Sequence, residues 1–297
     1  YLLLIACLSF SFVKAQIVNI PDTTFKNILI ENDCIDTDND GVGDSNIDLN
    51  GDGEIQLGEA EAVISLVIPN NEYTDATTGS TTYILDITGL EAFSNMEKLK
   101  VDTSLSTNLS TPLIDIDFGT NNQSLIELDL QDFRGLNSLN MGTKPNLEVI
   151  TIINALELYT IEIEDCISLT TLYLGMTNLT NVNLSQNVNL ISFSSDIFGG
   201  SSLDFSQNIN LETISVNYPS VLIDIDVSSN TNLKHLNVIG SFDITSIDVS
   251  ENLLLETLNA SQNYALETLN LKNGSALTSL DFSPVNLTYF YAGDNLF

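Results

Sequence analysis

The chain has 297 residues, with 8 Lys and Arg against 40 Asp and Glu, which gives a formal net charge of −32. A surface of this charge repels nucleic acid and anionic lipid, so neither is an expected partner, whereas cations and basic partners suit it. Apolar residues make up 43% of the chain, too many for a disordered acidic tail, so a long core can be buried.

Residues 1–15 form an apolar run that ends in Ala15. Apolar residues at the −3 and −1 positions predict a secretory signal peptide cleaved before Gln16, and hence a secreted or cell-surface protein. Because the run begins at Tyr1 without a basic region, we expect a few residues to precede it. A lipoprotein-type cleavage box ending at Cys7 is the alternative. No other segment is long and apolar enough to predict a membrane span.

Residues 16–62 are expected to form a small N-terminal cap with helical character. The segment Thr24–Glu31 places three apolar residues on one helical face, namely Phe25, Ile28 and Leu29. A second helix is expected to begin at Glu59. Cys34 in this segment and Cys166 further along lie far apart in the sequence, so no disulfide is expected to hold the exported chain together.

The stretch DLNGDGEIQLGE, residues 48–59, resembles an EF-hand calcium loop. The resemblance assigns oxygen ligands to Asp48, Asn50, Asp52, the Glu54 backbone carbonyl and Glu59, with Gly53 at the sharp turn. Residues 31–61 hold eleven carboxylates and no basic residue, and a divalent cation would supply the missing counter-charge. We therefore predict bound Ca²⁺; an acidic loop that binds nothing is the alternative.

Just upstream, DTDNDGVGD resembles a thrombospondin type 3 calcium repeat. It predicts a second, weaker site that consists of Asp36, Asp38, Asp40 and Asp44. The twelfth position of this loop is Ile47, not an acid, so the loop either borrows Asp48 or is an insertion in a single site. Two paired loops would suggest a dockerin that binds a cohesin, but the incomplete second loop and the repeats that follow directly disfavour it.

Residues 63–297 contain repeats of 21 or 22 residues. The turns begin at Leu125, Leu147, Leu169, Leu190, Leu211, Leu233, Leu255 and Leu277. Each turn has two short stretches in which apolar and polar residues alternate, which is typical of strands with one buried face. Polar residues between the stretches turn the chain without a helix. A coil this short cannot bury its own apolar face, so the turns must stack into a solenoid.

A second column follows the second stretch of each turn. It contains Asn121, Lys144, Cys166, Asn187, Asn208, Asn230, Asn252 and Gly274. Inward asparagines are expected to form a structural ladder that donates to and accepts from backbone groups of adjacent turns. Cys166 can replace the amide weakly through its S–H group. Lys144 cannot be buried unpaired, which predicts a locally open turn there.

Two segments, IDVSSNTNLKHLNV and IDVSENLLLETLNA, resemble the repeat of bacterial leucine-rich-repeat proteins of the internalin and exported Bacteroidetes types. The resemblance covers about residues 60–297. It implies a right-handed solenoid of short parallel strands with little helix. Asparagines expected after the first stretch are missing at Phe133, Thr177 and Pro219, and an insertion around Asp75–Thr82 lengthens the first turn. The pattern is interrupted at the last residue, so we expect further repeats or a sorting domain beyond it.

One outward residue per turn lies within the second stretch. This column contains Asp117, Asn140, Glu162, Asn183, Asp204, Asp226, Asp248 and Asn270. Stacking would bring successive side chains to roughly 4.8 Å, so adjacent carboxylates should repel one another. The column is either a solvated polar edge or an acidic stripe that binds cations or a basic partner, with Asp117, Glu162, Asp204, Asp226 and Asp248 as its acids.

Three functions are consistent with these features. The first is an exported interaction protein that binds an extracellular protein or glycan through its solenoid, with structural calcium in the cap. The second is a carbohydrate-active β-helix enzyme, a lyase or glycosidase, which the scarcity of basic residues and the single His235 disfavour. The third is a purely structural calcium-dependent rod. We expect the first, with no catalytic activity.

Overall fold

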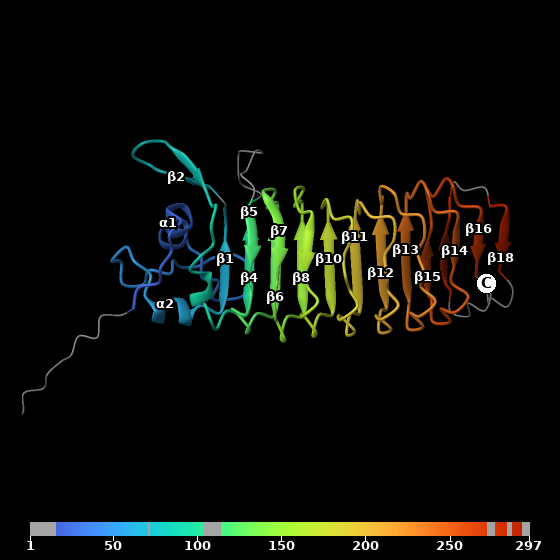
Figure 1. The fold of residues 1–297 in the computed structure, drawn as a ribbon, viewed down its shortest axis with the longest axis horizontal. Helices are drawn as coiled ribbons and strands as arrows, with labels where there is room; N and C mark the ends of the chain where they lie inside the picture. Colours follow the sequence, from blue (N-terminus) through green and yellow to red (C-terminus); the bar gives the residue numbers. More distant parts are fainter. Residues whose placement is uncertain (1–15, 71, 104–113, 272–276, 284–286, 293–297) are drawn as a thin grey trace, which may run out of the picture.

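The structure is a computed structural model that describes residues 16–70, 72–103, 114–271, 277–283 and 287–292. The chain coils into successive turns along one long axis, and its strands stand side by side across that axis (Figure 1). The predicted solenoid of short parallel strands with little helix is confirmed. Residues 1–15, with the expected signal peptide, and Gly274 of the expected ladder lie outside the described residues.

The first stretches of the turns form one ten-stranded sheet, the long sheet, in which all neighbouring strands are parallel. Its strands, in spatial order, are β1 (Ser65–Ile68), β4 (Lys98–Asp102), β6 (Glu127–Gln131), β8 (Val149–Ile153), β10 (Thr171–Gly175), β11 (Ser192–Asp196), β12 (Thr213–Asn217), β13 (His235–Ile239), β15 (Thr257–Asn259) and β17 (Ser279–Asp281). The register aligns equivalent positions of each turn, so that Leu172 pairs with Phe193 and Phe193 with Ile214. Inward side chains therefore stack on inward side chains from one turn to the next.

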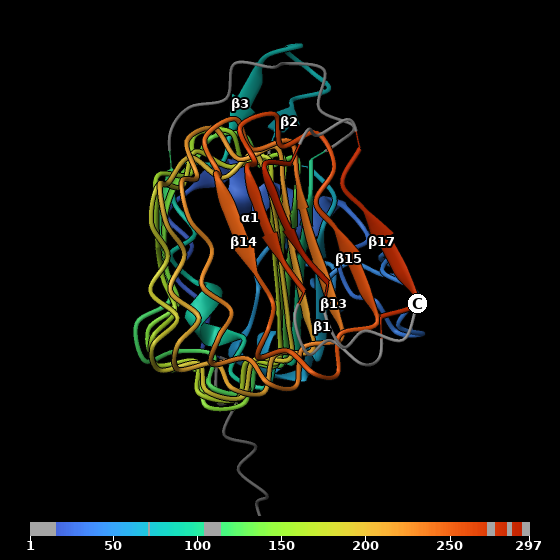
Figure 2. The same ribbon diagram turned by 90° about the vertical axis from the view of Figure 1, so that its right-hand side faces the viewer.

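Within the described residues, the second stretches form sheets near the two ends of the array. One short sheet contains β5 (Ile114–Asp117), β7 (Leu136–Asn140) and β9 (Thr160–Glu162), and another contains β14 (Ser246–Asp248), β16 (Thr268–Asn270) and β18 (Tyr289–Tyr291). Figure 2, which looks along the solenoid, shows β14 across the coil from β13 and β15. Between the two short sheets, the bridge Asp204–Asp226 is the pairing recorded for second stretches. The prediction of a strand in the second stretch of each turn was therefore wrong for the middle turns.

A continuous apolar core fills the interior. The leucines that begin the turns are all buried, from Leu125 at 0% exposure to Leu277 at 8%. Phe193 and Phe205 meet edge to face with ring centroids 5.1 Å apart, across the interior between a first and a second stretch. Burying each such side chain stabilises the fold by about 1.5–3 kcal/mol. Cys34 and Cys166 are both free thiols in this core, and burial raises the pKa of each to about 12.

The asparagine ladder is present in four consecutive turns, at Asn187, Asn208, Asn230 and Asn252, all fully buried. Each Nδ2 donates to two backbone carbonyls of the preceding turn; that of Asn208, for example, reaches Leu184 O at 3.0 Å and Asn187 O at 2.8 Å. The four amide oxygens accept no hydrogen bond from the described groups, contrary to the expected donation and acceptance. Each of these carbonyls also accepts a backbone amide of its own corner, so the ladder adds a second donor to it and ties each corner to the next.

Two ladder predictions were wrong. Asn121 is exposed, and the buried residue is Asn122, whose Nδ2 donates to Leu90 O at 2.9 Å and Phe93 O at 3.1 Å. Asn122 is in step with Lys144, twenty-two residues later, whereas Asn121 is not. Lys144 does not open its turn: it is fully buried, and its Nζ donates to three backbone carbonyls, Gly119 O at 3.1 Å, Met141 O at 2.6 Å and Thr143 O at 3.3 Å. A long side chain can bring its ammonium group back to these corner carbonyls, which a short one could not.

The N-terminal segment packs onto the first strand of the long sheet. The predicted first helix is confirmed as α1 (Thr23–Glu31), with its three apolar residues buried, and α2 (Leu57–Ala62) begins two residues earlier than expected. Ile35 pairs antiparallel with Leu66 of β1, and the amide of Val67 donates to Cys34 O at 2.8 Å. This pairing covers the otherwise open edge of the sheet.

The expected insertion in the first turn is an antiparallel hairpin of β2 (Glu72–Thr74) and β3 (Thr81–Tyr83), which projects from the coil (Figure 1). A short 3-10 helix, η1 (Leu90–Ala92), follows it and leads into β4. Within the part of the chain that the structure describes, no helix is long and apolar enough to cross a bilayer.

Candidate functional site

The loop at residues 48–59 is organised by its own side chains. The Asp48 carboxylate accepts backbone hydrogen bonds from Gly51 N at 2.8 Å and Gly53 N at 2.7 Å. Both glycines have positive φ, 73° and 80°, a conformation that glycine adopts without strain. Glu59 accepts from Leu49 N at 3.0 Å and from Gln56 N at 2.9 Å, so it closes the loop and caps α2 at once. The loop thus holds the side chains of its first and last expected ligands in place.

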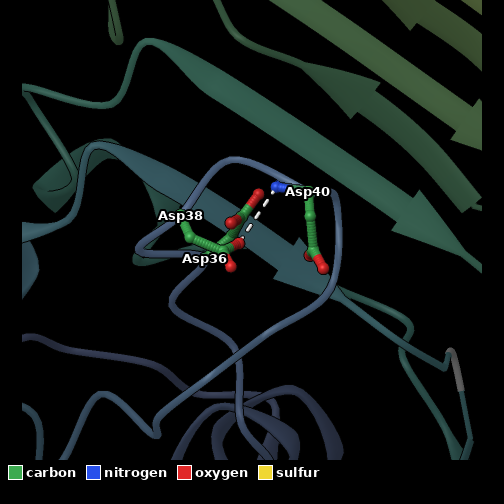
Figure 3. Close-up of side chains that lie close together, drawn as sticks. All are labelled: Asp36, Asp38 and Asp40. Atoms are coloured by element: carbon green, nitrogen blue, oxygen red, sulfur yellow. Dashed lines mark hydrogen bonds between the residues drawn. The ribbon is translucent and has the colours of Figure 1, made fainter.

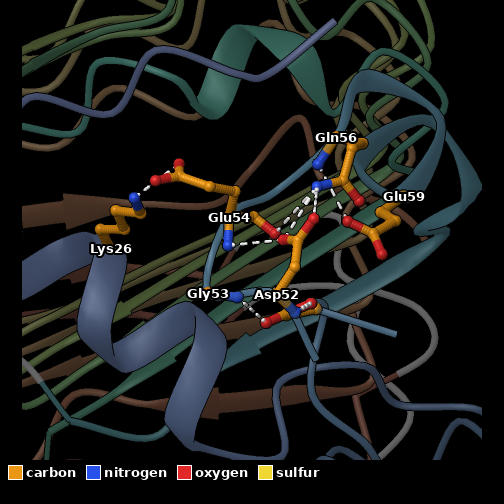
Figure 4. A network of polar contacts seen from close by, with 7 residues as sticks. Lys26, Asp52, Gly53, Glu54, Gln56 and Glu59 are labelled. Carbon is orange, nitrogen blue, oxygen red and sulfur yellow. Dashed lines mark hydrogen bonds and ion pairs between the residues drawn. The ribbon is translucent and has the colours of Figure 1, made fainter. Parts of the chain in front are cut away.

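Gln56 lies at the centre of this loop (Figure 4). Its Nε2 donates to both carboxylate oxygens of Asp52, at 3.1 Å each, and contacts the Glu54 carbonyl at 3.5 Å. The Asn50 side chain bonds to Gln56 Oε1 at 2.6 Å. The Glu54 carboxylate points away and pairs with Lys26 Nζ at 2.6 Å. Oxygens of two expected ligands, Asp52 and Glu54, therefore meet at the Gln56 amide group. Oxygen donors of this kind suit a hard cation.

The loop at residues 36–44 repeats the same hydrogen-bond pattern. Asp36 accepts from Asn39 N at 2.6 Å and from Gly41 N at 3.0 Å, and both donors again have positive φ, 65° and 82°. Asp44 accepts from Thr37 N at 2.7 Å, as Glu59 does from Leu49, and hydrogen bonds from Thr37 lower the pKa of Asp44. Asp44 thus closes this loop in the position that Glu59 has in the other. Ile47 is fully buried in the core and offers no ligand.

The carboxylates of Asp36, Asp38 and Asp40 are grouped together (Figure 3), with potential ligand oxygens within 4.8 Å of one another. Among the described residues this is the one group of three potential metal-ligating side chains that meets this distance. Asp36 is nearly buried, and it also receives the Ser65 hydroxyl of β1 at 3.4 Å. The loop that the sequence ranks second therefore has the tighter carboxylate cluster, and it lies against the edge of the long sheet.

The acidic column has a structural role that the sequence analysis did not anticipate. Asp204, Asp226 and Asp248 each accept a hydrogen bond at 2.9 Å from the backbone amide of the serine two residues later. Asp117, Asn140 and Asn183 make the same turn with the second residue after them. These bonds from Ser206 and Ser228 lower the pKa values of Asp204 and Asp226, while the neighbouring carboxylates oppose the shift at Asp226. The repeated D-x-S spacing is the signal that predicts these side-chain-capped corners.

Glu162 and Asn270 complete the predicted column. Glu162 is exposed at the end of β9, and Asn270 donates through Nδ2 to Asp248 Oδ2 at 3.0 Å. That bond links the column across two turns. A shallow groove lies beside Asp226 and Asp248, bounded also by Asp224 and Glu251.

The outward face of the long sheet changes character along the solenoid. At β4 and β6 it carries charges, including the pair Lys98–Glu127 at 3.1 Å. From β8 to β15 the outward residues are Val149, Thr151, Ile153, Thr171, Tyr173, Gly175, Ser192, Ser194, Asp196, Thr213, Ser215, Asn217, His235, Asn237, Ile239, Thr257 and Asn259. We call this set the neutral face, because it contains a single carboxylate, Asp196, in a chain with 40 acidic residues.

The polar groups of the neutral face are bonded to one another. Asp196 accepts from the Tyr173 hydroxyl and from Asn217 Nδ2, each at 2.7 Å, and Asn237 Nδ2 donates to Asn217 Oδ1 at 2.8 Å. Burial and the bond to Asp196 raise the pKa of Tyr173 to about 12, so its hydroxyl stays protonated. His235 Nδ1 bonds to the Thr257 hydroxyl at 2.9 Å. The network holds these side chains in fixed positions across β10 to β15.

A column of left-handed residues follows the strands of the long sheet. Asp132, Asn154, Met176, Ile197, Tyr218, Gly240 and Gln262 all have positive φ, between 51° and 70°. Asp, Asn and Gly tolerate this conformation, but Met and Tyr adopt it at a cost and a β-branched Ile is an outlier. The sequence does not predict this column, because four of its seven members, Met176, Ile197, Tyr218 and Gln262, are residue types that do not indicate a left-handed corner.

Comparisons with known proteins bear on the fold. No known family and no curated protein matches the sequence. Among solved structures, the chain is similar to the functional domain of InlJ from Listeria monocytogenes, with 18% identity and a TM-score of 0.42, covering 83% of this chain and 67% of that one. It is also similar to an internalin, InlF, from Listeria monocytogenes, with 20% identity, a TM-score of 0.28, and coverage of 77% and 90%.

A leucine-rich-repeat protein from Leptospira interrogans matches at 16% identity and a TM-score of 0.28, over 78% of this chain and 81% of that one. The solved structures that the chain resembles are therefore bacterial repeat proteins of the internalin and leucine-rich-repeat kind. Likeness at this level assigns neither a family nor a function to the chain.

Proposed function

We propose that this chain is an exported, non-catalytic binding protein that presents the neutral face of its long sheet to an extracellular protein or glycan. The neutral face itself is the observation that carries the proposal. The chain has a net charge of −32, so a surface that crosses six strands and contains one carboxylate is improbable by chance. Burying polar groups that can be re-bonded by a ligand costs far less free energy than burying charges, so such a face can be desolvated on binding.

The face supports binding better than catalysis. Glycoside cleavage requires a pair of carboxylates on either side of the bond, and the outward residues from β8 to β15 include only Asp196. That carboxylate is already bonded to Tyr173 and Asn217. His235 is bonded to Thr257 and has no acid beside it on the face. We therefore favour recognition over the lyase or glycosidase alternative.

The binding proposal is tested by placing a charge on the neutral face. Ser194 lies outward on β11, so Ser194→Arg should lower binding to fractionated extracellular proteins and polysaccharides at least tenfold in biolayer interferometry. Ser246→Arg, at an exposed position of β14 across the coil, is the matched control and should bind as the wild type does. Equal loss in both variants, or in neither, would contradict a ligand site on the long sheet.

We also propose that calcium has a structural role in the N-terminal segment, as a cap of the solenoid. The donors that would hold it are Asp48, Asn50, Asp52, the Glu54 carbonyl and Glu59, with a second ion at Asp36, Asp38, Asp40 and Asp44. Support comes from the shared hydrogen-bond pattern of the two loops and from the pairing of Cys34–Asp36 with β1. An ion there would offset the mutual repulsion of the carboxylates and tie the loops to the first strand.

The calcium proposal is tested by thermal unfolding. With a dissociation constant of ~10⁻⁴–10⁻³ M, 1 mM Ca²⁺ should stabilise the wild type by about 0.4–1.4 kcal/mol per site. Glu59→Gln and Asp40→Asn should each remove part of that increment, and the double variant should remove it all. Glu91→Gln, a carboxylate outside both loops, is the control. A wild type whose melting temperature does not respond to Ca²⁺ or to a chelator would rule the proposal out.

A further inference from the structure

The left-handed column contains three consecutive residues whose backbone conformation is unfavourable for their residue type. Met176, Ile197 and Tyr218 have φ of 54°, 60° and 51°, and they are 45%, 43% and 52% exposed. Asp132 and Asn154, in the two preceding turns of the same column, are residues that tolerate this conformation. Backbone strain combined with exposed apolar side chains is concentrated at functional sites.

These three side chains form one ridge at the edge of the neutral face. The amide of each donates to the last strand residue of the following turn: Met176 N to Asp196 O at 3.0 Å, Ile197 N to Asn217 O at 2.8 Å, and Tyr218 N to Ile239 O at 2.7 Å. Neighbouring ridge positions therefore lie at the strand spacing of roughly 4.8 Å. The acceptors Asp196 and Asn217 belong to the hydrogen-bond network of the neutral face, so ridge and face are contiguous.

Two further turns extend the apolar edge. The Tyr218 ring covers Gly240, where an added Cβ would lie 2.5 Å from the ring, so that only glycine fits beneath it. Two residues beyond this corner, Phe242 stacks with Tyr264 of the next turn at a centroid distance of 6.4 Å and an interplanar angle of 19°. These two rings are 64% and 62% exposed. Flat, solvent-facing aromatic rings thus occur in three turns of the array.

We propose that the ridge and the neutral face together bind an uncharged polysaccharide that runs along the solenoid axis. This proposal rests on the proposed function and names the partner class for the same surface. The C–H faces of sugar rings would stack on Tyr218 and on the Phe242–Tyr264 pair, as apolar groups do on aromatic faces. Sugar hydroxyls would exchange hydrogen bonds with Asn217, Asn237 and the hydroxyls of the face.

Charge separates this partner from the others that an exposed apolar edge could take. An anionic polysaccharide or a second copy of the chain would be repelled by the net charge of −32. A basic protein would gain most from the acidic column, which lies on the second stretches and away from the long sheet. A neutral chain of hydroxyl groups matches a face that carries one carboxylate, Asp196, and many hydroxyl and amide groups.

The test is native affinity electrophoresis in gels that contain one polysaccharide each. Laminarin, xyloglucan, galactomannan and dextran are the neutral probes, alginate is the anionic probe, and soluble polylysine is the basic one. We expect at least one neutral probe to retard the wild type and alginate to have no effect. Tyr218→Asn should weaken that retardation at least fivefold without lowering the melting temperature, because asparagine tolerates the left-handed corner. Gln262→Asn, in the same column but outside the ridge, is the control and should be retarded as the wild type is.

Several outcomes would overturn the inference. They are equal retardation of wild type and Tyr218→Asn, retardation by alginate alone, interaction with polylysine alone, or no retardation by any neutral probe. If the neutral probes fail while Ser194→Arg still loses binding to a protein fraction in biolayer interferometry, then the glycan assignment is wrong and the proposed binding face stands. A lowered melting temperature of Tyr218→Asn would show that Tyr218 stabilises the fold. Met176→Asn then repeats the test at a second ridge position.

Discussion

Two columns of the same turns follow opposite rules. Inside the coil, Asn187, Asn208, Asn230 and Asn252 repeat one residue type with one set of hydrogen bonds. At the edge of the long sheet, Met176, Ile197 and Tyr218 occupy left-handed corners for which asparagine or glycine would be favoured. The inner column lowers the free energy of the fold, and the outer one raises it. A residue type that repeats from turn to turn therefore identifies contacts that stabilise the solenoid, and a departure from the favoured type identifies a position that those contacts do not explain.

The largest expected effect is loss of one ladder amide. Asn208→Ala removes two buried hydrogen bonds between neighbouring turns and leaves the carbonyls of Leu184 and Asn187 with their backbone donors alone, so it should lower the free energy of unfolding by about 2–3 kcal/mol. Urea denaturation followed by circular dichroism measures it. Asn210→Ala is the matched control, because Asn210 makes one exposed bond to Val188 O and should change stability by less than about 0.5 kcal/mol. Similar losses in the two variants would mean that the buried ladder amide stabilises the fold no more than an exposed asparagine does.

Substitution of Lys144 tests whether this column requires asparagine or only a side-chain hydrogen-bond donor. Lys144→Met keeps an unbranched side chain but removes the ammonium group and its three hydrogen bonds to carbonyls, so we expect a loss of about 1–2 kcal/mol near pH 7. Burial lowers the pKa of Lys144 from its usual 10.5, so between the lowered value and 10.5 the unfolded chain binds more protons than the folded one. Wild-type stability should rise over that window, and the rise should be absent in Lys144→Met. An unchanged or more stable variant would show that the buried ammonium group does not stabilise the folded state.

In the outer column, a substitution is expected to change the free energy of unfolding in the opposite direction. Ile197→Asn relieves a β-branched residue at φ 60° and should raise the free energy of unfolding by about 1 kcal/mol. The same urea titration measures it. Asn154→Ile makes the reverse change in the same column, at a residue that also bonds to Asp132, and should destabilise by at least as much. If Ile197→Asn is less stable than the wild type, Ile197 contributes packing that its 43% exposure does not suggest, and the contrast between the columns weakens.

The smallest effect is expected in the acidic column. Asp226→Asn keeps an oxygen acceptor for Ser228 N and removes repulsion from Asp204 and Asp248, so stability at pH 7 should change by less than about 0.5 kcal/mol. The pKa of Asp226 is lowered in the fold. Its carboxylate therefore contributes stability above the unfolded value near 3.8, and that contribution is lost as the pH falls through the folded value. Other carboxylates with lowered pKa, such as Asp204, remain in the variant, so acid titration should show a loss of stability below pH ~4 in both proteins that is slightly larger in the wild type.

Much of the fold could be predicted from the sequence, because a fixed period specifies which side chains stack. The leucines that begin each turn and four ladder asparagines are where the period places them. The ladder position in the first of these turns is ambiguous, because residues 121 and 122 are both asparagines and only strict spacing favours Asn122. The burial of Lys144 could not be predicted, because residue type alone says nothing about carbonyls within reach of a long side chain.

The candidate sites could be predicted less well, for a physical reason. The two acidic loops can be recognised in the sequence because their ligands are close together in it. The equivalence of Asp44 and Glu59 cannot, because it rests on the hydrogen bonds that the two carboxylates accept from the backbone amides of Thr37 and Leu49 in the fold. The neutral face and the ridge are assembled from residues about twenty-two positions apart. No local window contains them, and left-handed φ at Ile197 is invisible to propensity.

The ridge residues keep the sheet paired through their backbone amides, and their side chains take no part in that pairing. Substitution at these corners by any residue except proline therefore keeps the backbone donors that pair the strands. Met176, Ile197 and Tyr218 can then be exchanged one at a time while the strands stay paired. Under the proposed function, the ligand preference of this edge would vary independently of the scaffold that carries it.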